Sequence, residues 1–145
     1  YLIPWLEHNN SLTVKAQNLG NTVKVLLISE SWQGDMFRRE VLIKCNNIAC
    51  WYGRTSIPIN TYMLREKSFK NLSAKAIGSI LFNDPNINIK TRRILQFEVE
   101  NLKFLKQTAL EINEAKLWGR TTVFEVENQP LYLTEVFLPT MKNIK

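Results

Sequence analysis

Residues 39–58, REVLIKCNNIACWYGRTSIP, contain two strand-like runs on either side of an Asn-Asn pair. Asparagine tolerates the positive φ angles that a two-residue hairpin turn needs. The stretch therefore predicts an antiparallel hairpin. A turn at the two asparagines places the following residues opposite each other: Cys45 and Ile48, Ile43 and Cys50, Val41 and Tyr52, Arg39 and Arg54.

The two cysteines of this hairpin are expected to stay free thiols in the core. In the predicted register Cys45 and Cys50 lie at successive rungs of one face, so a disulfide between them would strain the ladder. Their spacing is not C-x-x-C, and with the single histidine, His8, they do not make a zinc ligand set. We expect no bound metal.

Two further strand-like runs, 121–126 and 131–138, flank the turn-forming segment 127–130 and predict a second hairpin. Side chains alternate between the two faces of a strand. Glu135 therefore shares a face with three apolar residues, Leu131, Leu133 and Phe137. A carboxylate on a face that otherwise forms core is a candidate functional group.

The rest of the chain adds helices and strands around these hairpins. Ser11 is a typical N-cap and Gly20 a typical stop for a helix over 12–19. The remaining pattern predicts a strand at 23–28, a loop at 31–35, a helix at 71–82, extended chain at 87–100 and a helix at 101–117. Adjacent hairpins with helices before and between them favour the α+β class, a single antiparallel sheet with helices packed against it.

Composition indicates one globular domain spanning 1–145. The chain is 45% hydrophobic and 22% charged, the balance of a protein with a buried core. No apolar run approaches the roughly 18 residues of a membrane-spanning helix, and Tyr1 to Trp5 do not read as a signal peptide. We expect a cytoplasmic protein without membrane insertion, whose N-terminus is incomplete because the chain lacks an initiator Met.

The net charge of +6 could attract nucleic acid, and an anionic small ligand explains it equally well. Lysines and arginines are scattered along the sequence, and no nucleic-acid-binding motif is present. The sequence also lacks a G-x-G-x-x-G fingerprint and a P-loop, which argues against a nucleotide-binding α/β protein. We expect no nucleic-acid partner.

Arg39 opposite Arg54 on an apolar face would require an anion, because like charges facing each other across strands destabilise a sheet. A guanidinium binds a carboxylate through two parallel hydrogen bonds, so two arginines suit a dicarboxylate. Glu135 would supply a further polar contact. The alternative is that Glu135 forms a structural ion pair with one arginine and that the register is off by one.

Six stretches resemble, in order, those of bacterial chorismate pyruvate-lyases: PWLEHNNSLTVKAQNLG (4–20), FRREVLIKC (37–45), CWYGRTSIP (50–58), IGSILF (77–82), LWGRTTVF (117–124) and PLYLTEVFLP (130–139). The resemblance implies a cofactor-free enzyme that converts chorismate to 4-hydroxybenzoate and pyruvate, the first step towards the ubiquinone ring. It also implies the family's antiparallel sheet with helices. A small-carboxylate-binding effector domain of the same general fold is the alternative, although such domains usually accompany a helix-turn-helix.

The resemblance assigns roles to individual residues. It implies that Arg39 binds the ring carboxylate, that Glu135 binds the hydroxyl, and that backbone amides at Leu12 and Ile77 also contact the carboxylate. Arg54, beside Gly53, would line the same cavity and hold the enolpyruvyl group, with Glu135 and Arg54 as the catalytic residues. We further expect a monomer that retains its product tightly.

Overall fold

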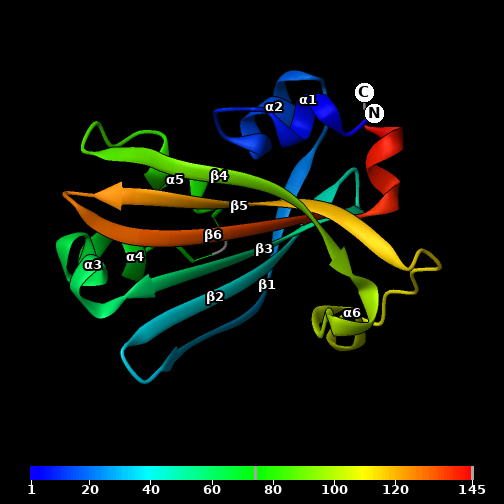
Figure 1. Cartoon of the computed structure of the whole chain (residues 1–145). Helices are drawn as coiled ribbons and strands as arrows, with labels where there is room; N and C mark the ends of the chain where they lie inside the picture. The colour runs from blue at the N-terminus through cyan, green and yellow to red at the C-terminus, as the bar shows by residue number, and fades with distance from the viewer. Residues whose placement is uncertain (74, 145) are drawn as a thin grey trace.

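The computed structural model describes residues 1–73 and 75–144 and forms a six-stranded antiparallel sheet in the order β1-β2-β3-β6-β5-β4 (Figure 1). The strands are β1 (Val23–Gln33), β2 (Met36–Cys45), β3 (Ile48–Pro58), β4 (Ile87–Glu98), β5 (Lys116–Val126) and β6 (Gln129–Phe137). The helices are short: α1 (Ile3–Leu6), α2 (Leu12–Asn18), α3 (Ile59–Leu64), α4 (Glu66–Lys70), α5 (Gly78–Leu81), α6 (Phe104–Gln107), η1 (Val99–Asn101) and η2 (Pro139–Asn143).

The β2–β3 hairpin forms as predicted at its turn but not beyond it. Asn46 and Asn47 have φ angles of 56° and 68°, and Cys45 faces Ile48. A bulge next to Ile43 then shifts the register by one residue. The three remaining predicted pairs are therefore wrong, and the observed partners are Ile43 with Trp51, Val41 with Gly53, and Arg39 with Thr55.

Burial explains this bulge. Cys50 and Trp51 are consecutive in β3, yet both are buried in the same hydrophobic cluster. A regular strand would send them to opposite faces, whereas the extra residue of a bulge lets the strand bury both. Trp51 packs against Trp5, with ring centroids 6.1 Å apart. Both cysteines are buried free thiols, as predicted.

The β5–β6 hairpin is also confirmed, with a tighter turn than predicted. Glu127 and Asn128 alone form the turn, with φ angles of 48° and 70°, and Val126 faces Gln129. The predicted face of β6 is correct, because Glu135 is buried on the side that contains Leu131.

At the N-terminal end, the predicted helix is confirmed and the predicted loop is wrong. Ser11 Oγ accepts a hydrogen bond from the amide of Val14 and caps α2. The predicted loop at 31–35 is largely strand, since β1 continues to Gln33. Trp32 holds this end of β1 in place, because its ring lies 4.8 Å from that of Tyr62, centroid to centroid.

The two later helices are shorter than predicted. Within 71–82 only α5 is helical, and residue 74 of that range lies outside the described residues. Within 101–117 only α6 and the end of η1 are helical. Ala109 has a φ of 55°, which no α-helix accommodates. Apolar residues of this region still pack on the outer face of the sheet, with Leu105 of α6 in the cluster there and Leu102 against it.

Side chains divide between two faces of the sheet. The cavity face carries Trp51, Leu133 and Phe137 and is covered by α2 and α5. The outer face carries Leu42, Tyr52 and Val136 and packs against α6. Across the described residues, none of the helices has the length and apolar character that spanning a membrane requires.

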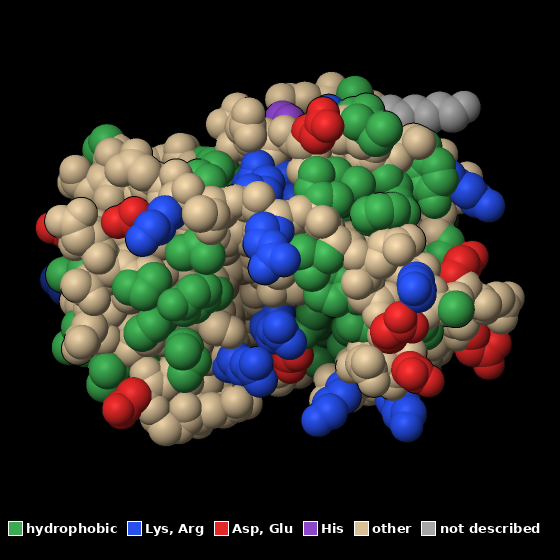
Figure 2. All heavy atoms as spheres, in the orientation of Figure 1, with side chains coloured by type: hydrophobic (Ala, Val, Ile, Leu, Met, Phe, Trp, Pro, Cys, Tyr) green, Lys and Arg blue, Asp and Glu red, His purple; other side chains and the backbone are tan. Residues whose placement is uncertain are grey.

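Positive side chains that are scattered in the sequence gather in space. Figure 2 shows a band of Lys and Arg across the middle of the molecule, between groups of hydrophobic side chains. Strand register can produce such clustering: Arg93 and Arg54 lie on one rung of the outer face, separated by Thr121 and Thr134. The absence of a nucleic-acid partner stays a prediction.

Candidate active site

Two neighbouring rungs of the cavity face hold the charged groups. The arginine rung crosses five strands, from β2 to β4, through Arg39, Thr55, Leu133, Thr122 and Arg92. The glutamate rung, two residues further along each strand, runs through Val41, Gly53, Glu135, Arg120 and Ile94. Directly paired residues share a face, so these side chains project to the same side of the sheet.

A cavity lies over these rungs, between the sheet and the starts of α2 and α5. It contains about 440 Å³ of space free of atoms, part of it open to solvent. Its wall includes four of the predicted site residues, Leu12, Gly53, Ile77 and Glu135. The amides of Leu12 and Ile77 have no hydrogen-bond acceptor among the described residues.

Two of the residues that line the cavity are glycines in close contact with their neighbours. A Cβ atom at Gly53 would lie 3.3 Å from Val41 Cγ2, and one at Gly78 would lie 3.0 Å from Ser11 Oγ. The second contact sets the approach of α5 to the start of α2. The first contact lies within the sheet that forms the floor of the cavity, because Gly53 and Val41 are paired neighbours.

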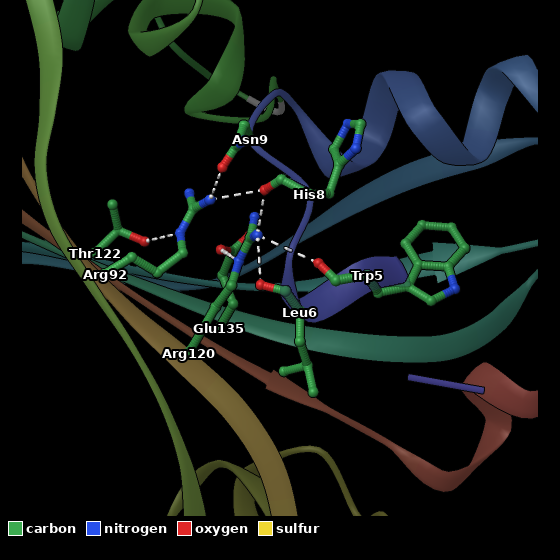
Figure 3. Close-up of polar contacts among 8 residues, drawn as sticks. All are labelled: Trp5, Leu6, His8, Asn9, Arg92, Arg120, Thr122 and Glu135. Carbon is green, nitrogen blue, oxygen red and sulfur yellow. Dashed lines mark hydrogen bonds and ion pairs between the residues drawn. The ribbon is translucent and has the colours of Figure 1, made fainter. Parts of the chain in front are cut away.

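Glu135 is fixed by an arginine that faces it directly across the β5–β6 pair. Arg120 Nε donates to Glu135 Oε1 at 2.7 Å, and both side chains are buried (Figure 3). Arg120 Nη1 also donates to three backbone carbonyls of the N-terminal segment, those of Trp5, Leu6 and His8, at 3.2, 3.3 and 2.6 Å. Glu135 Oε2 has no hydrogen-bond partner among the described residues and can accept one from a ligand.

Arg39 is on the same face of the sheet as the cavity but is not one of its lining residues; its strand partner Thr55 and its neighbour Val41 are. Its side chain is buried, and Nη2 donates to the carbonyls of Ser73 and Lys75 at 2.8 and 2.7 Å. Nε is 3.5 Å from Glu30 Oε2, an ion-pair distance at which no hydrogen bond forms. Burial lowers the pKa of Arg39, and Glu30 partly opposes that shift.

The predicted position of Arg54 in the cavity is wrong. Because of the bulge, Arg54 faces Glu40 on the outer face rather than Arg39. Glu40 accepts hydrogen bonds there from Ser29 Oγ at 2.6 Å and from Tyr52 Oη. Arg54 therefore lies on the opposite side of the sheet from Glu135 and does not line the cavity.

The alternative from the sequence analysis holds, because the hairpin register is off by one and Glu135 is ion-paired with an arginine. Sequence reasoning did not identify that arginine as Arg120, although a signal for it exists. A two-residue turn at Glu127-Asn128 sets the register that places Arg120 opposite Glu135. The predicted four-residue turn would have placed Thr122 there instead. Asparagine in a position of positive φ was the local signal of the shorter turn.

The cavity face of the sheet thus carries two buried groups with unused hydrogen-bonding capacity. One is the guanidinium of Arg39, and the other is the free oxygen of Glu135. Within residues 1–73 and 75–144, no three His, Cys, Asp or Glu side chains are grouped as metal ligands would be.

The chain belongs to the chorismate lyase family, whose profile matches residues 2–144. A protein of Psychromonas ingrahamii described as "Probable chorismate pyruvate-lyase" is 30% identical over 155 residues, which cover 95% of this chain and 82% of that relative. The "Chorismate pyruvate-lyase" of Salmonella schwarzengrund is 27% identical, with 96% of this chain and 83% of that relative covered. Family membership supports a lyase that acts on chorismate, a small-molecule substrate.

Solved structures share the fold at low sequence identity. The crystal structure of PhnF from Mycobacterium smegmatis superposes with a TM-score of 0.66 at 12% identity and covers 93% of this chain and 66% of that one. The effector domain of PhnF gives a TM-score of 0.64 at 12% identity, with 90% and 89% covered. The predicted α+β class with one antiparallel sheet is thus confirmed.

Proposed function

We propose that this chain is a chorismate pyruvate-lyase that forms 4-hydroxybenzoate and pyruvate without a cofactor and supplies the ring precursor of ubiquinone. The observation that carries the proposal is the fixed Glu135 carboxylate, which lines a cavity on the face of the sheet that also carries the buried Arg39. The family match supports the identity of the substrate.

In this proposal the ring lies along the sheet with its carboxylate towards Arg39. The Nε atom of Arg39 and the amides of Leu12 and Ile77 are the donors for that carboxylate. The 4-hydroxyl, at the opposite end of the ring, donates to Glu135 Oε2. Charge-assisted hydrogen bonds at both ends fix the orientation of the ring.

The reaction breaks the ether bond at ring carbon C3 and removes the hydrogen from C4, which makes the ring aromatic. The leaving enolpyruvate gains one proton at its methylene carbon and becomes pyruvate, so that atoms balance. Aromatisation provides the driving force, and the protein has to hold the reactive conformer and stabilise the developing negative charge. Glu135 holds the hydroxyl next to the C4 hydrogen and is the general base of the proposal.

Product retention follows from the same contacts. The carboxylate and hydroxyl of 4-hydroxybenzoate are also present in chorismate, so the product keeps the contacts with Arg39 and Glu135. A buried guanidinium without a full set of acceptors is costly, so the product stabilises the site it occupies. We expect 4-hydroxybenzoate to be released when the purified protein is denatured and identified by mass spectrometry.

The proposal is tested by incubating the purified chain with chorismate and measuring pyruvate release with a coupled dehydrogenase. We expect turnover by the wild type and a decrease of about 100-fold or more for Glu135→Gln, which keeps the shape but cannot act as a base. Glu125→Gln, on the exposed end of β5, is the matched control and should retain wild-type turnover. Absence of pyruvate from the folded wild type would contradict the proposal.

A sensor domain is the second candidate, because the chain superposes on the effector domain of PhnF. The same experiment separates the two functions. A sensor would bind 4-hydroxybenzoate or chorismate in a titration and release no pyruvate, whereas an enzyme does both.

A further inference from the structure

Arg92 on β4 has one guanidinium nitrogen without a partner. Its Nε donates to Thr122 Oγ1 at 3.0 Å, and its Nη1 donates to the His8 carbonyl at 2.7 Å and to Asn9 Oδ1 at 3.4 Å (Figure 3). Nη2 is buried and has no hydrogen-bond partner among residues 1–73 and 75–144. An unsatisfied buried donor on a charged group is costly, so a native protein needs a reason for it.

The position of this donor in the sheet is informative. In the described part of the chain, two buried side-chain polar atoms lack a partner: Arg92 Nη2 and Arg39 Nε. They belong to the two ends of the arginine rung, with β6 and its Glu135 between them. Two unsatisfied cationic donors thus flank the strand that carries the candidate catalytic carboxylate.

The β4 end of the site also has an excess of positive charge. Arg92 and Arg120 both donate to the carbonyl of His8, so their guanidinium groups lie side by side (Figure 3). Glu135 is the carboxylate bonded to Arg120, and no ion pair to Arg92 exists among the described residues. Burial, and then repulsion by Arg120, lower the pKa of Arg92 to about 10, while Glu135 opposes the shift. An anion bound here would offset both effects.

The proposed substrate carries a second carboxylate that also needs a cationic partner. Chorismate has its ring carboxylate at C1, its hydroxyl at C4 and its enolpyruvyl ether at C3, next to the hydroxyl. With the ring carboxylate at Arg39 and the hydroxyl at Glu135, an enolpyruvyl group that points away from β2 points towards β5 and β4, which lie beyond β6 in the sheet. Arg92 is the unsatisfied cation on that side.

We propose that Arg92 binds the enolpyruvyl carboxylate of the substrate through Nη2, a role that rests on the proposed lyase function. It takes the place that sequence analysis gave to Arg54, which lies on the outer face. Arg92 holds the leaving group and has no contact with the product ring. It therefore distinguishes substrate from product, whereas Arg39 and Glu135 bind both.

The test compares two stable ligands by calorimetric titration. 4-Hydroxybenzoate lacks the second carboxylate, and 3-(carboxymethoxy)-4-hydroxybenzoate carries one on an ether at the position of the enolpyruvyl group. Arg92→Met should weaken binding of the dicarboxylate about tenfold or more, the usual loss for a hydrogen bond between charged groups. It should change binding of 4-hydroxybenzoate by no more than about twofold.

The control is Arg93→Met, the neighbouring arginine, which is exposed on the other face and should leave both affinities unchanged. If Arg92→Met does not fold, Arg92→Gln serves in its place, because its amide can still donate to the His8 carbonyl. Equal losses for both ligands would mean that Arg92 only anchors the N-terminal segment and would overturn the inference. A wild type that binds 4-hydroxybenzoate but prefers it to the dicarboxylate would overturn it as well. A wild type that binds neither ligand and releases no pyruvate would instead overturn the proposed function.

Discussion

Each face of the sheet carries a glutamate that faces an arginine on the neighbouring strand, and the two pairs are built differently. On the cavity face, Glu135 and Arg120 are buried and joined at 2.7 Å, and Arg120 is also held by three backbone carbonyls. On the outer face, Glu40 and Arg54 are half-buried, and Glu40 takes its hydrogen bonds from Ser29 and Tyr52.

The difference between the two pairs indicates which face of the sheet carries the functional charges. Burying an ion pair costs so much desolvation that apolar residues of similar size often stabilise a protein equally well. Stability alone therefore does not account for the buried pair, whose free carboxylate oxygen lies next to a cavity, and under the proposed function that oxygen binds the substrate. The outer pair keeps contact with solvent, and such pairs contribute little to stability. We therefore expect substitutions on the cavity face to change both stability and activity, and substitutions on the outer face to change stability alone.

The largest effect is expected for Arg120→Met, which leaves Glu135 buried and unpaired. Removing one partner of a buried ion pair costs about 3–5 kcal/mol, and three carbonyls of the N-terminal segment lose their donor as well. Urea unfolding should show a loss of this size, and pyruvate release should cease. The double variant Arg120→Met/Glu135→Leu should recover most of the stability and none of the activity. A double variant that is less stable than Arg120→Met would contradict the claim that the unpaired, buried Glu135 carboxylate causes the loss of stability.

An intermediate effect is expected for Tyr52→Phe on the outer face. Burial raises the pKa of Glu40, but the hydrogen bonds from Ser29 and Tyr52 lower it by more, so the pKa lies below its ordinary value of 4.5. A carboxylate with a lowered pKa stabilises the fold above its unfolded-state pKa and loses that contribution as pH falls through the folded value. Removing the Tyr52 hydroxyl should cost about 0.5–1.5 kcal/mol at neutral pH.

The same variant should make stability less dependent on pH in the acid range. Thermal unfolding of wild type and Tyr52→Phe from pH 7 down to about pH 3 should show the difference between them shrinking below 4.5, the ordinary pKa of Glu40. Pyruvate release at neutral pH should be unaffected, because this group lies on the face away from the cavity. If the stability difference between wild type and Tyr52→Phe grew as the pH fell, the hydrogen bond from Tyr52 to the Glu40 carboxylate would not be its cause.

The smallest effect is expected for Arg54→Met. Arg54 has partial contact with solvent and forms no ion pair among the described residues, and substitutions of that kind usually change stability by about 0.5 kcal/mol or less. The variant should unfold at nearly the wild-type urea concentration and turn over chorismate at nearly the wild-type rate. A large loss of activity at unchanged stability would show that this arginine reaches the substrate after all.

Local turn chemistry predicted much of the sheet. The turn at Asn46-Asn47, the existence of a second hairpin around 127–130 and the burial of Glu135 were predicted from sequence, although the second turn is two residues long and not four. The bulge at Cys50 was not readable, because it arises where two consecutive residues both pack into the core. That single inserted residue moved Arg54 from the cavity face to the outer face.

The cationic part of the site depends on tertiary structure and could be predicted only in part. Arg39 was found from a motif, although the partner that the sequence suggested for it was wrong. No local sequence pattern singles out Arg92. Its contact with the carbonyl of His8 and its unsatisfied nitrogen arise only when the N-terminal segment and β4 come together in the folded chain. The predictions of long helices at 71–82 and 101–117 were wrong for a similar reason. Packing against the sheet overrode the helical periodicity of these segments.

The central claim is that one face of the sheet binds the substrate, and a titration of 4-hydroxybenzoate into two arginine variants tests it most directly. Arg39→Met and Arg54→Met remove the same group from neighbouring strands on opposite faces. We expect Arg39→Met to weaken binding about tenfold or more and Arg54→Met to change it by less than about twofold. Equal effects, or a larger loss for Arg54→Met, would contradict the account.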